Sequence, residues 1–84
     1  MLSNLLLYRS LTQTQKAATM LGRNGIQNRV IRAPRMLAGE GCSHSVRLSQ
    51  QDLYRALAYL RAMDLIPKRI YVTAGNGNYE EVLL

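Results

Sequence analysis

The stretch SQQDLYRALAYLRAMD, residues 49 to 64, is the most regular part of the chain and decides how the rest is interpreted. Its apolar residues recur at helical spacing and form one stripe. The stripe consists of Leu53, Ala56, Leu57, Leu60 and Met63. Ser49 is a favoured N-cap residue, Asp52 stands where a capping box has its reciprocal acid, and Pro67 prevents continuation. We therefore predict an amphipathic helix over residues 50 to 63.

The segments on either side of this helix have the alternation of strands. In SHSVRLS, residues 43 to 49, every second residue faces the same way, so that His44, Val46 and Leu48 share one face. RIYVT, residues 69 to 73, alternates in the same manner and is rich in β-branched residues. A strand is predicted before the helix and another after it.

The N-terminal part predicts the same three elements again. NLLLYR, residues 4 to 9, is a short apolar run with the length of a buried strand. A helix follows, with Ser10 or Thr12 as its cap and Gly25 as its stop. IQNRVIRAP, residues 26 to 34, then predicts a second strand that ends at the proline.

The order of elements is therefore β-α-β-β-α-β, which indicates an α+β fold. Two helices on one face of a four-stranded antiparallel sheet would bury both apolar stripes. Right-handed crossovers make this a ferredoxin-like arrangement with strand order 4-1-3-2. We predict a single domain over residues 1–84, with a core at 1–75 and a tail at 76–84.

The composition narrows the class of protein. The 84 residues include 11 basic and 5 acidic side chains, so the net charge of +6 suits nucleic acid, an anionic ligand, an acidic partner protein or a solvated surface. A single cysteine forms no internal disulfide. The N-terminus lacks the pattern of a secretory signal, and no apolar run is long enough to span a membrane. We expect a cytoplasmic protein.

The predicted sheet argues against one kind of partner and for another. RNA-binding sheets of this class stack bases on aromatic residues of their central strands, whereas SVRLS supplies none and Tyr8 and Tyr71 are isolated. Nucleic acid is therefore not an expected partner. The sheet face opposite the helices must be covered or polar, and Tyr8, Tyr71 and several arginines would line it. We expect a homodimer through this face.

The chemistry centres on AGEGCSHSVRLS, residues 38 to 49, which holds the only cysteine and the only histidine. Nearby positive charge and backbone N–H groups favour the thiolate, the reactive form of a thiol. Arg35 and Arg47 are close in sequence to Cys42, and Gly39 and Gly41 leave the backbone accessible. Cys42 is therefore a candidate nucleophile or sulfur acceptor. The alternative is a structural cysteine that fills a small space at the sheet end.

His44 would lie on the same side of an extended segment as Cys42, where it could orient the thiol or relay its proton. The alternative is an ordinary polar residue at the start of a strand. Cys42, His44 and Glu40 are too few and too closely spaced for a closed zinc site, so a metal would need a site shared across a symmetric oligomer, and none is expected. No phosphate-binding loop is present either, and we expect no cofactor.

The segment PRMLAGEGCSHSVRL, residues 34 to 48, resembles a family of small bacterial proteins described as selenium/sulfur carrier protein-like, formerly a domain of unknown function. The resemblance covers most of the chain, including the opening strand, the first helix and the NGI turn into the second strand. Many members have serines before the cysteine and a glycine after it. This chain instead has Gly39, Glu40 and Gly41 before Cys42 and Ser43 after it.

The resemblance implies a function without turnover of its own. Cys42 would hold a persulfide or perselenide, received from a cysteine desulfurase or a selenium-metabolism protein and passed to an acceptor. Arg35 and Arg47 would stabilise the charge on the thiolate or persulfide. Two other functions remain open: a ferredoxin-like binding or regulatory module with an incidental cysteine, and a redox switch in which Cys42 pairs with another chain's cysteine.

Overall fold

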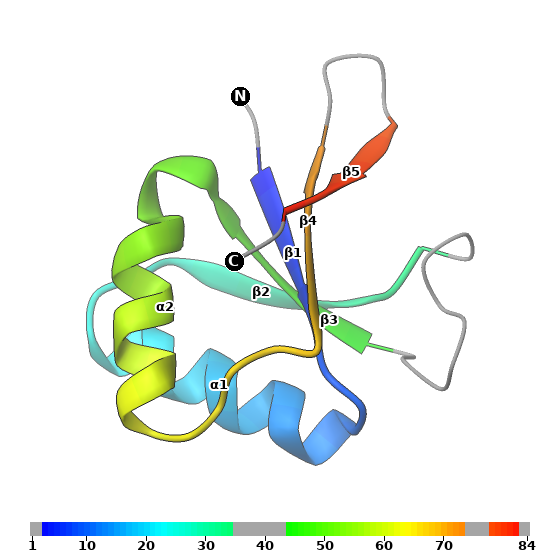
Figure 1. The fold of residues 1–84 in the computed structure, drawn as a ribbon. Helices are drawn as coiled ribbons and strands as arrows, with labels where there is room; N and C mark the ends of the chain where they lie inside the picture. Colours follow the sequence, from blue (N-terminus) through cyan, green and yellow to red (C-terminus); the bar gives the residue numbers. More distant parts are fainter. Residues whose placement is uncertain (1–2, 35–43, 74–77, 83–84) are drawn as a thin grey trace.

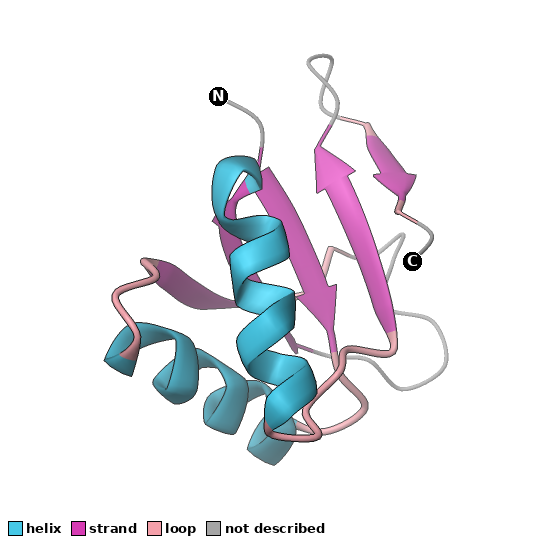
Figure 2. Ribbon diagram, turned by 60° about the vertical axis from the view of Figure 1, so that its left-hand side comes forward, coloured by secondary structure: helices cyan, strands magenta, loops and turns pink. Residues whose placement is uncertain are grey.

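Strand β1 (Ser3–Leu7) lies at the centre of the sheet, and all five of its residues are buried. A strand covered on both faces needs apolar residues in succession rather than in alternation, which explains the run of three leucines. The computed structural model describes residues 3–34, 44–73 and 78–82 (Figure 1). Within these ranges two helices pack on one face of an antiparallel sheet (Figure 2). The predicted α+β class is confirmed.

The described part of the sheet has five strands in the order β2-β3-β1-β4-β5, and all neighbours pair antiparallel. Besides β1 these are β2 (Asn28–Arg32), β3 (His44–Ser49), β4 (Arg69–Thr73) and β5 (Tyr79–Glu81). The prediction of four strands is wrong. The first four strands stand side by side as β2-β3-β1-β4, and β5 is added outside β4.

Strand β5 comes from residues that we assigned to a tail. It is held by the ladder to β4, by an ion pair of 3.1 Å between Arg69 and Glu81, and by a backbone hydrogen bond of 2.8 Å from Val82 to the carbonyl of Ile70. Val82 also packs against the main core. A segment of three residues carries too little periodicity to predict a strand, and only its pairing with β4 makes it one.

Helix α1 (Leu11–Arg23) begins and ends as its sequence predicts. The side chain of Ser10 accepts a hydrogen bond of 3.1 Å from the backbone N–H of Gln13, so Ser10 is the cap. At the other end Gly25 has φ of 78°, a left-handed conformation that glycine adopts without steric cost. The N–H of Ile26 then bonds to the carbonyl of Leu21 at 2.9 Å and turns the chain into β2.

The second helix begins differently from the prediction. A 3₁₀ turn over Gln50–Asp52 precedes α2 (Leu53–Ala62), and the side chain of Ser49 makes no capping hydrogen bond. Asp52 pairs with Arg55 at 3.3 Å instead of closing a capping box. The stripe is buried as expected except at its last member, since Met63 follows the helix and is 51% exposed. The 3₁₀ turn removes three residues from the helix and shifts its start.

Two apolar clusters lie on opposite faces of the sheet. The helix-face core consists of Leu6, Tyr8, Ala17, Leu21, Ile26, Val46, Leu48, Leu53, Ala56, Leu57, Leu60 and Ile70. The open-face cluster consists of the buried Leu5 and Leu7 with the half-buried Ile31, Tyr71 and Tyr79. The alternation predicted for β3 and β4 is confirmed, because Val46 and Ile70 face the helices.

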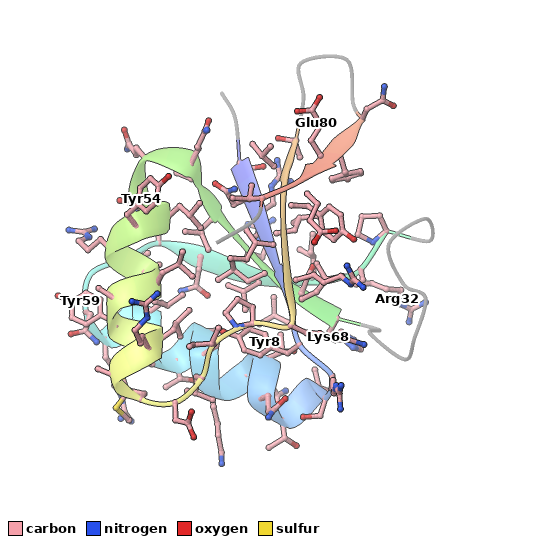
Figure 3. All side chains as sticks on the ribbon, viewed as in Figure 1. Tyr8, Arg32, Tyr54, Tyr59, Lys68 and Glu80 are labelled. Carbon is pink, nitrogen blue, oxygen red and sulfur yellow. The ribbon has the colours of Figure 1, made fainter. Side chains whose placement is uncertain are left out.

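One aromatic residue lies on the other side from the one we expected. Tyr8 is only 2% exposed and belongs to the helix-face core, where its hydroxyl donates a hydrogen bond of 2.6 Å to the carbonyl of Leu65. Figure 3 shows its ring beneath the sheet beside α1. Tyr71 does lie on the open face. The homodimer through that face stays a prediction.

Candidate functional site

Most of the residues that we expect to carry the chemistry lie outside the described ranges. Arg35, Gly39, Gly41 and Cys42 are among them, so their predicted roles stay predictions. The structure does describe the residues on either side. Strand β2 ends at Arg32, and β3 begins at His44, so the site can be characterised from the sheet end where these strands meet.

Arg32 and His44 stand directly opposite each other in the antiparallel pair of β2 and β3. Side chains in such a pair have Cβ atoms about 5 Å apart, within reach of a common ligand. Arg32 is exposed, and His44 is half-buried. The last residue of β2 is therefore an arginine, and the first residue of β3 is a histidine.

More basic residues gather at the same end of the sheet. Strand β1 ends here at Leu7, β4 begins here, and the backbone N–H of Lys68 donates a hydrogen bond of 2.7 Å to the carbonyl of Leu7. The basic sheet end, as we name it, consists of Arg9, Arg32, His44, Lys68 and Arg69. Figure 3 shows Arg32 and Lys68 at this end. The ion pair with Glu81 offsets one of these charges.

A shallow cavity of about 290 Å³ opens beside the basic sheet end. It is lined by Tyr8, Arg9, Gln13, Ile66 and Lys68. Two cationic side chains in one hollow suit an anion, and a thiolate or persulfide is an anion. The cavity is therefore suited to an anion, and the predicted role of Cys42, which lies outside the described residues, stays a prediction.

Ser45 is a residue of this end that sequence reasoning missed. It follows His44 on β3, is completely buried, and its hydroxyl oxygen has no hydrogen-bond partner among the described residues. Its Cα partners are Leu7 on β1 and Ile31 on β2, so it belongs to the open face. Alternation alone assigned this position to an outward face, and outward residues are ordinarily solvated. No local signal indicates that this part of the face is covered.

Arg47 lies away from the basic sheet end. It is three residues beyond His44 on an extended strand, an odd separation that puts the two side chains on opposite faces and about 10 Å apart along the strand. Its Nε donates a hydrogen bond of 3.3 Å to the hydroxyl of Ser3. The structure thus does not bring Arg47 together with His44, and its role toward Cys42 stays a prediction.

The acidic and histidine side chains of residues 3–34, 44–73 and 78–82 include no group of three that could hold a metal ion. Among the same residues, neither helix has both the length and the apolar character needed to cross a membrane.

Comparison with known protein families identifies the chain. Residues 3–72 of the 84 match the family described as "Putative Se/S carrier protein-like". The chain belongs to this family. The match runs from the first residue of β1 to Val72 in β4, includes the segment that holds Cys42, and ends before β5. No curated protein matches the chain, and no solved structure matches it. The resemblance inferred from residues 34 to 48 is thereby confirmed for this Se/S carrier-like protein.

Proposed function

We propose that this Se/S carrier-like protein holds sulfur or selenium on Cys42 as a persulfide or perselenide. The observation that carries the proposal is the family match, because it spans the only cysteine of the chain. Cys42 precedes His44 by two residues, so chain geometry alone keeps its Cα within about 7 Å of that of His44. The proposal therefore has the thiol act beside the basic sheet end.

The proposed transfer is an exchange between two sulfur atoms. The thiolate of Cys42 attacks the outer sulfur of a donor persulfide, the sulfur–sulfur bond of the donor breaks, and the donor leaves as a thiolate. Cys42 then carries the persulfide, and no external oxidant or reductant is consumed. Cations near the thiol raise its thiolate fraction at neutral pH, and Arg32 and Lys68 supply such charge from described positions, beside the predicted Arg35 and Arg47.

The proposed role is that of a carrier, not of an enzyme with its own turnover. The proposed donor is a cysteine desulfurase or a selenium-metabolism protein, with a separate acceptor. A lone thiol stays available for such transfer only in a reducing compartment, which supports the cytoplasm as the proposed location. His44 is the proposed relay for the proton that leaves Cys42, because it is the one histidine and stands at the end of the segment.

The test is to incubate the purified protein with a desulfurase and cysteine and to weigh it intact. We expect an added mass of one sulfur atom on the wild type and none on the Cys42→Ser variant. Ser45→Ala is the matched control, since it changes a hydroxyl nearby and leaves the thiol in place. An unmodified wild type, or an equal adduct on Cys42→Ser, would contradict the carrier and leave the binding module as the better account.

Alkylation separates the two groups of cations. If the basic sheet end activates the thiol, Arg32→Gln slows alkylation of Cys42 at neutral pH by severalfold. Arg47→Gln slows it as well only if the predicted contact of Arg47 with the thiolate exists. If Cys42 reacts only after the protein is denatured, the thiol is buried and the cysteine is structural.

A further inference from the structure

Two arginines lie on the open face, toward the end of β3 that is away from His44. The proposed carrier function gives a role to only one of them, Arg47. Arg29 on β2 and Arg47 on β3 are direct cross-strand partners, and both are exposed. Their Cβ atoms are about 5 Å apart, and like charges placed directly opposite each other destabilise a sheet. In the described part of the chain, ion pairs join Arg55 to Asp52 and Arg69 to Glu81, and neither includes these two arginines.

Arg47 is held in place by a chain of hydroxyl groups. Its Nε donates to the hydroxyl of Ser3, and that hydroxyl lies 3.3 Å from the hydroxyl of Thr73. Thr73 in turn donates to the carbonyl of Ser3 at 3.2 Å and accepts from its backbone N–H at 3.1 Å. These contacts use only one nitrogen of the guanidinium. The two terminal nitrogens remain as a fork, the geometry that binds oxyanions bidentately.

A cavity of about 540 Å³ lies at this arginine pair. It is lined by Ser3, Gln27, Asn28, Arg29, Arg47, Leu48, Ser49, Gln51 and Asp52. Ser49 adds a hydroxyl that does not cap the following turn, and its Cα partner on β1 is Ser3. The volume falls within the range of small-molecule sites. Asp52 is the one acid in the lining, and it pairs with Arg55 at 3.3 Å.

We propose that Arg29, Arg47 and Ser49 bind the phosphate group of a small molecule in this cavity, with Ser3 as the residue that positions Arg47. A phosphate monoester carries about −1.5 to −2 charges at neutral pH, which matches two cations better than one carboxylate does. Its three oxygens accept from two guanidinium forks and a hydroxyl together. The site uses residues other than Cys42 and lies at the opposite end of β3 from His44.

The first test measures binding of inorganic phosphate by calorimetry, with potassium chloride at equal ionic strength and acetate as comparison anions. We expect phosphate to bind, acetate to bind more weakly and chloride to have no specific effect. Arg29→Gln and Arg47→Gln each weaken phosphate binding about tenfold or more, because each removes a charge-assisted pair. Arg61→Gln, an exposed arginine on α2, is the matched control and leaves the affinity unchanged.

Two variants with opposite signs sharpen the test. Without phosphate, Arg29→Gln melts at or above the temperature of the wild type, because it relieves the repulsion between the two arginines; with phosphate the order reverses. Asp52→Asn tightens phosphate binding, because it removes the one acid of the lining. Phosphoserine is the organic phosphate to compare with inorganic phosphate. Equal affinities would mean that the site contacts the phosphate group alone. Tighter binding of phosphoserine would mean that the site also contacts the rest of the molecule.

The outcomes that overturn the proposal are specific. Phosphate affinities that are the same in wild type, Arg29→Gln and Arg47→Gln would show that the pair is solvated surface. Binding of a single-stranded oligonucleotide without binding of phosphate or phosphoserine would replace the small molecule by a polyanion. Sulfur loading is a separate readout. Arg29→Gln should load sulfur like the wild type, because Arg29 has no role in the proposed carrier function. Cys42→Ser should bind phosphate like the wild type, because Cys42 is not part of the phosphate site.

Discussion

The two faces of the sheet differ most clearly at Leu5 and Leu6, which are neighbours on β1 and point to opposite sides. Both side chains are buried, at 1% and 0% exposure. Leu6 packs in the helix-face core among residues that are themselves buried. Leu5 packs in the open-face cluster, whose other members beyond Leu7 are only half-buried. The two leucines are therefore equally buried but differ in the burial of the residues around them. The loss of stability on truncating each side chain depends on those surrounding residues.

The faces also differ in what they contribute. The helix face holds the main apolar core, so it supplies most of the free energy of folding. Each face holds a buried oxygen without a partner among the described residues, Ser45 Oγ on the open face and Asn4 Oδ1 on the helix face, and the open face adds the cross-strand arginines; all of these features cost stability. Polar groups that destabilise a sheet and yet occupy it are expected where a protein binds something.

The largest expected effect tests this difference directly. Leu6→Ala should lower the free energy of unfolding by about 2–5 kcal/mol, because the rigid helix-face core cannot close the cavity. Leu5→Ala should cost less, since the half-buried side chains of Tyr71 and Tyr79 can move into the space. Urea denaturation of both variants is the measurement. Equal costs would show that the open face is a second rigid core.

Tyr8 tests the polar edge of the helix face. Tyr8→Phe removes the hydrogen bond to the carbonyl of Leu65 and should cost about 1–2 kcal/mol. Burial raises the pKa of the Tyr8 phenol well above its usual value of about 10. The unfolded chain therefore ionises first, and stabilisation that is complete below about pH 10 is lost as the pH rises further.

Urea denaturation between neutral and strongly alkaline pH checks this dependence. The free energy of unfolding should fall above about pH 10 in the wild type and fall less steeply in Tyr8→Phe. The exposed Tyr54 offers a matched control, because Tyr54→Phe removes a phenol hydroxyl from the surface instead of from the core. Identical slopes in wild type and Tyr8→Phe would mean that the phenol is not desolvated.

Ser45 gives a smaller effect with the opposite sign. Ser45→Ala removes a buried hydroxyl that has no partner among the described residues, so the free energy of unfolding should rise by about 1 kcal/mol. For a domain of this size the melting temperature would rise by about 4–8 °C. A thermal melt of the variant checks it. A drop in the melting temperature would show that the hydroxyl is satisfied in solution.

The smallest effect concerns the added strand. Glu81→Gln breaks the ion pair with Arg69, but both side chains are more than a third exposed, so the cost should be at most about 1 kcal/mol. The difference between variant and wild type should shrink at high salt, which screens exposed charges. A cost well above that of Tyr8→Phe would show that β5 depends on this pair rather than on its ladder to β4.

Several elements were predictable because their signals are local. The hydroxyl of Ser10 caps α1 by accepting a hydrogen bond from a residue only three positions away. Gly25 ends the helix with a positive φ, which glycine adopts easily because it has no side chain. The faces of β3 and β4 followed from alternation. Ser49 and Asp52 show the limit, since the same kind of signal predicted a cap and a 3₁₀ turn formed instead.

The sequence by itself determined the α+β class, the helix faces, the family and the candidate thiol, because periodicity, caps and a motif are properties of neighbouring residues. Only the tertiary structure decided that residues 79–81 join the sheet, that Tyr8 lies under the helices and that Ser45 is buried. It alone decided that Arg29 meets Arg47 across two strands. These outcomes depend on contacts between residues far apart in the chain, which strand register establishes and local sequence does not encode.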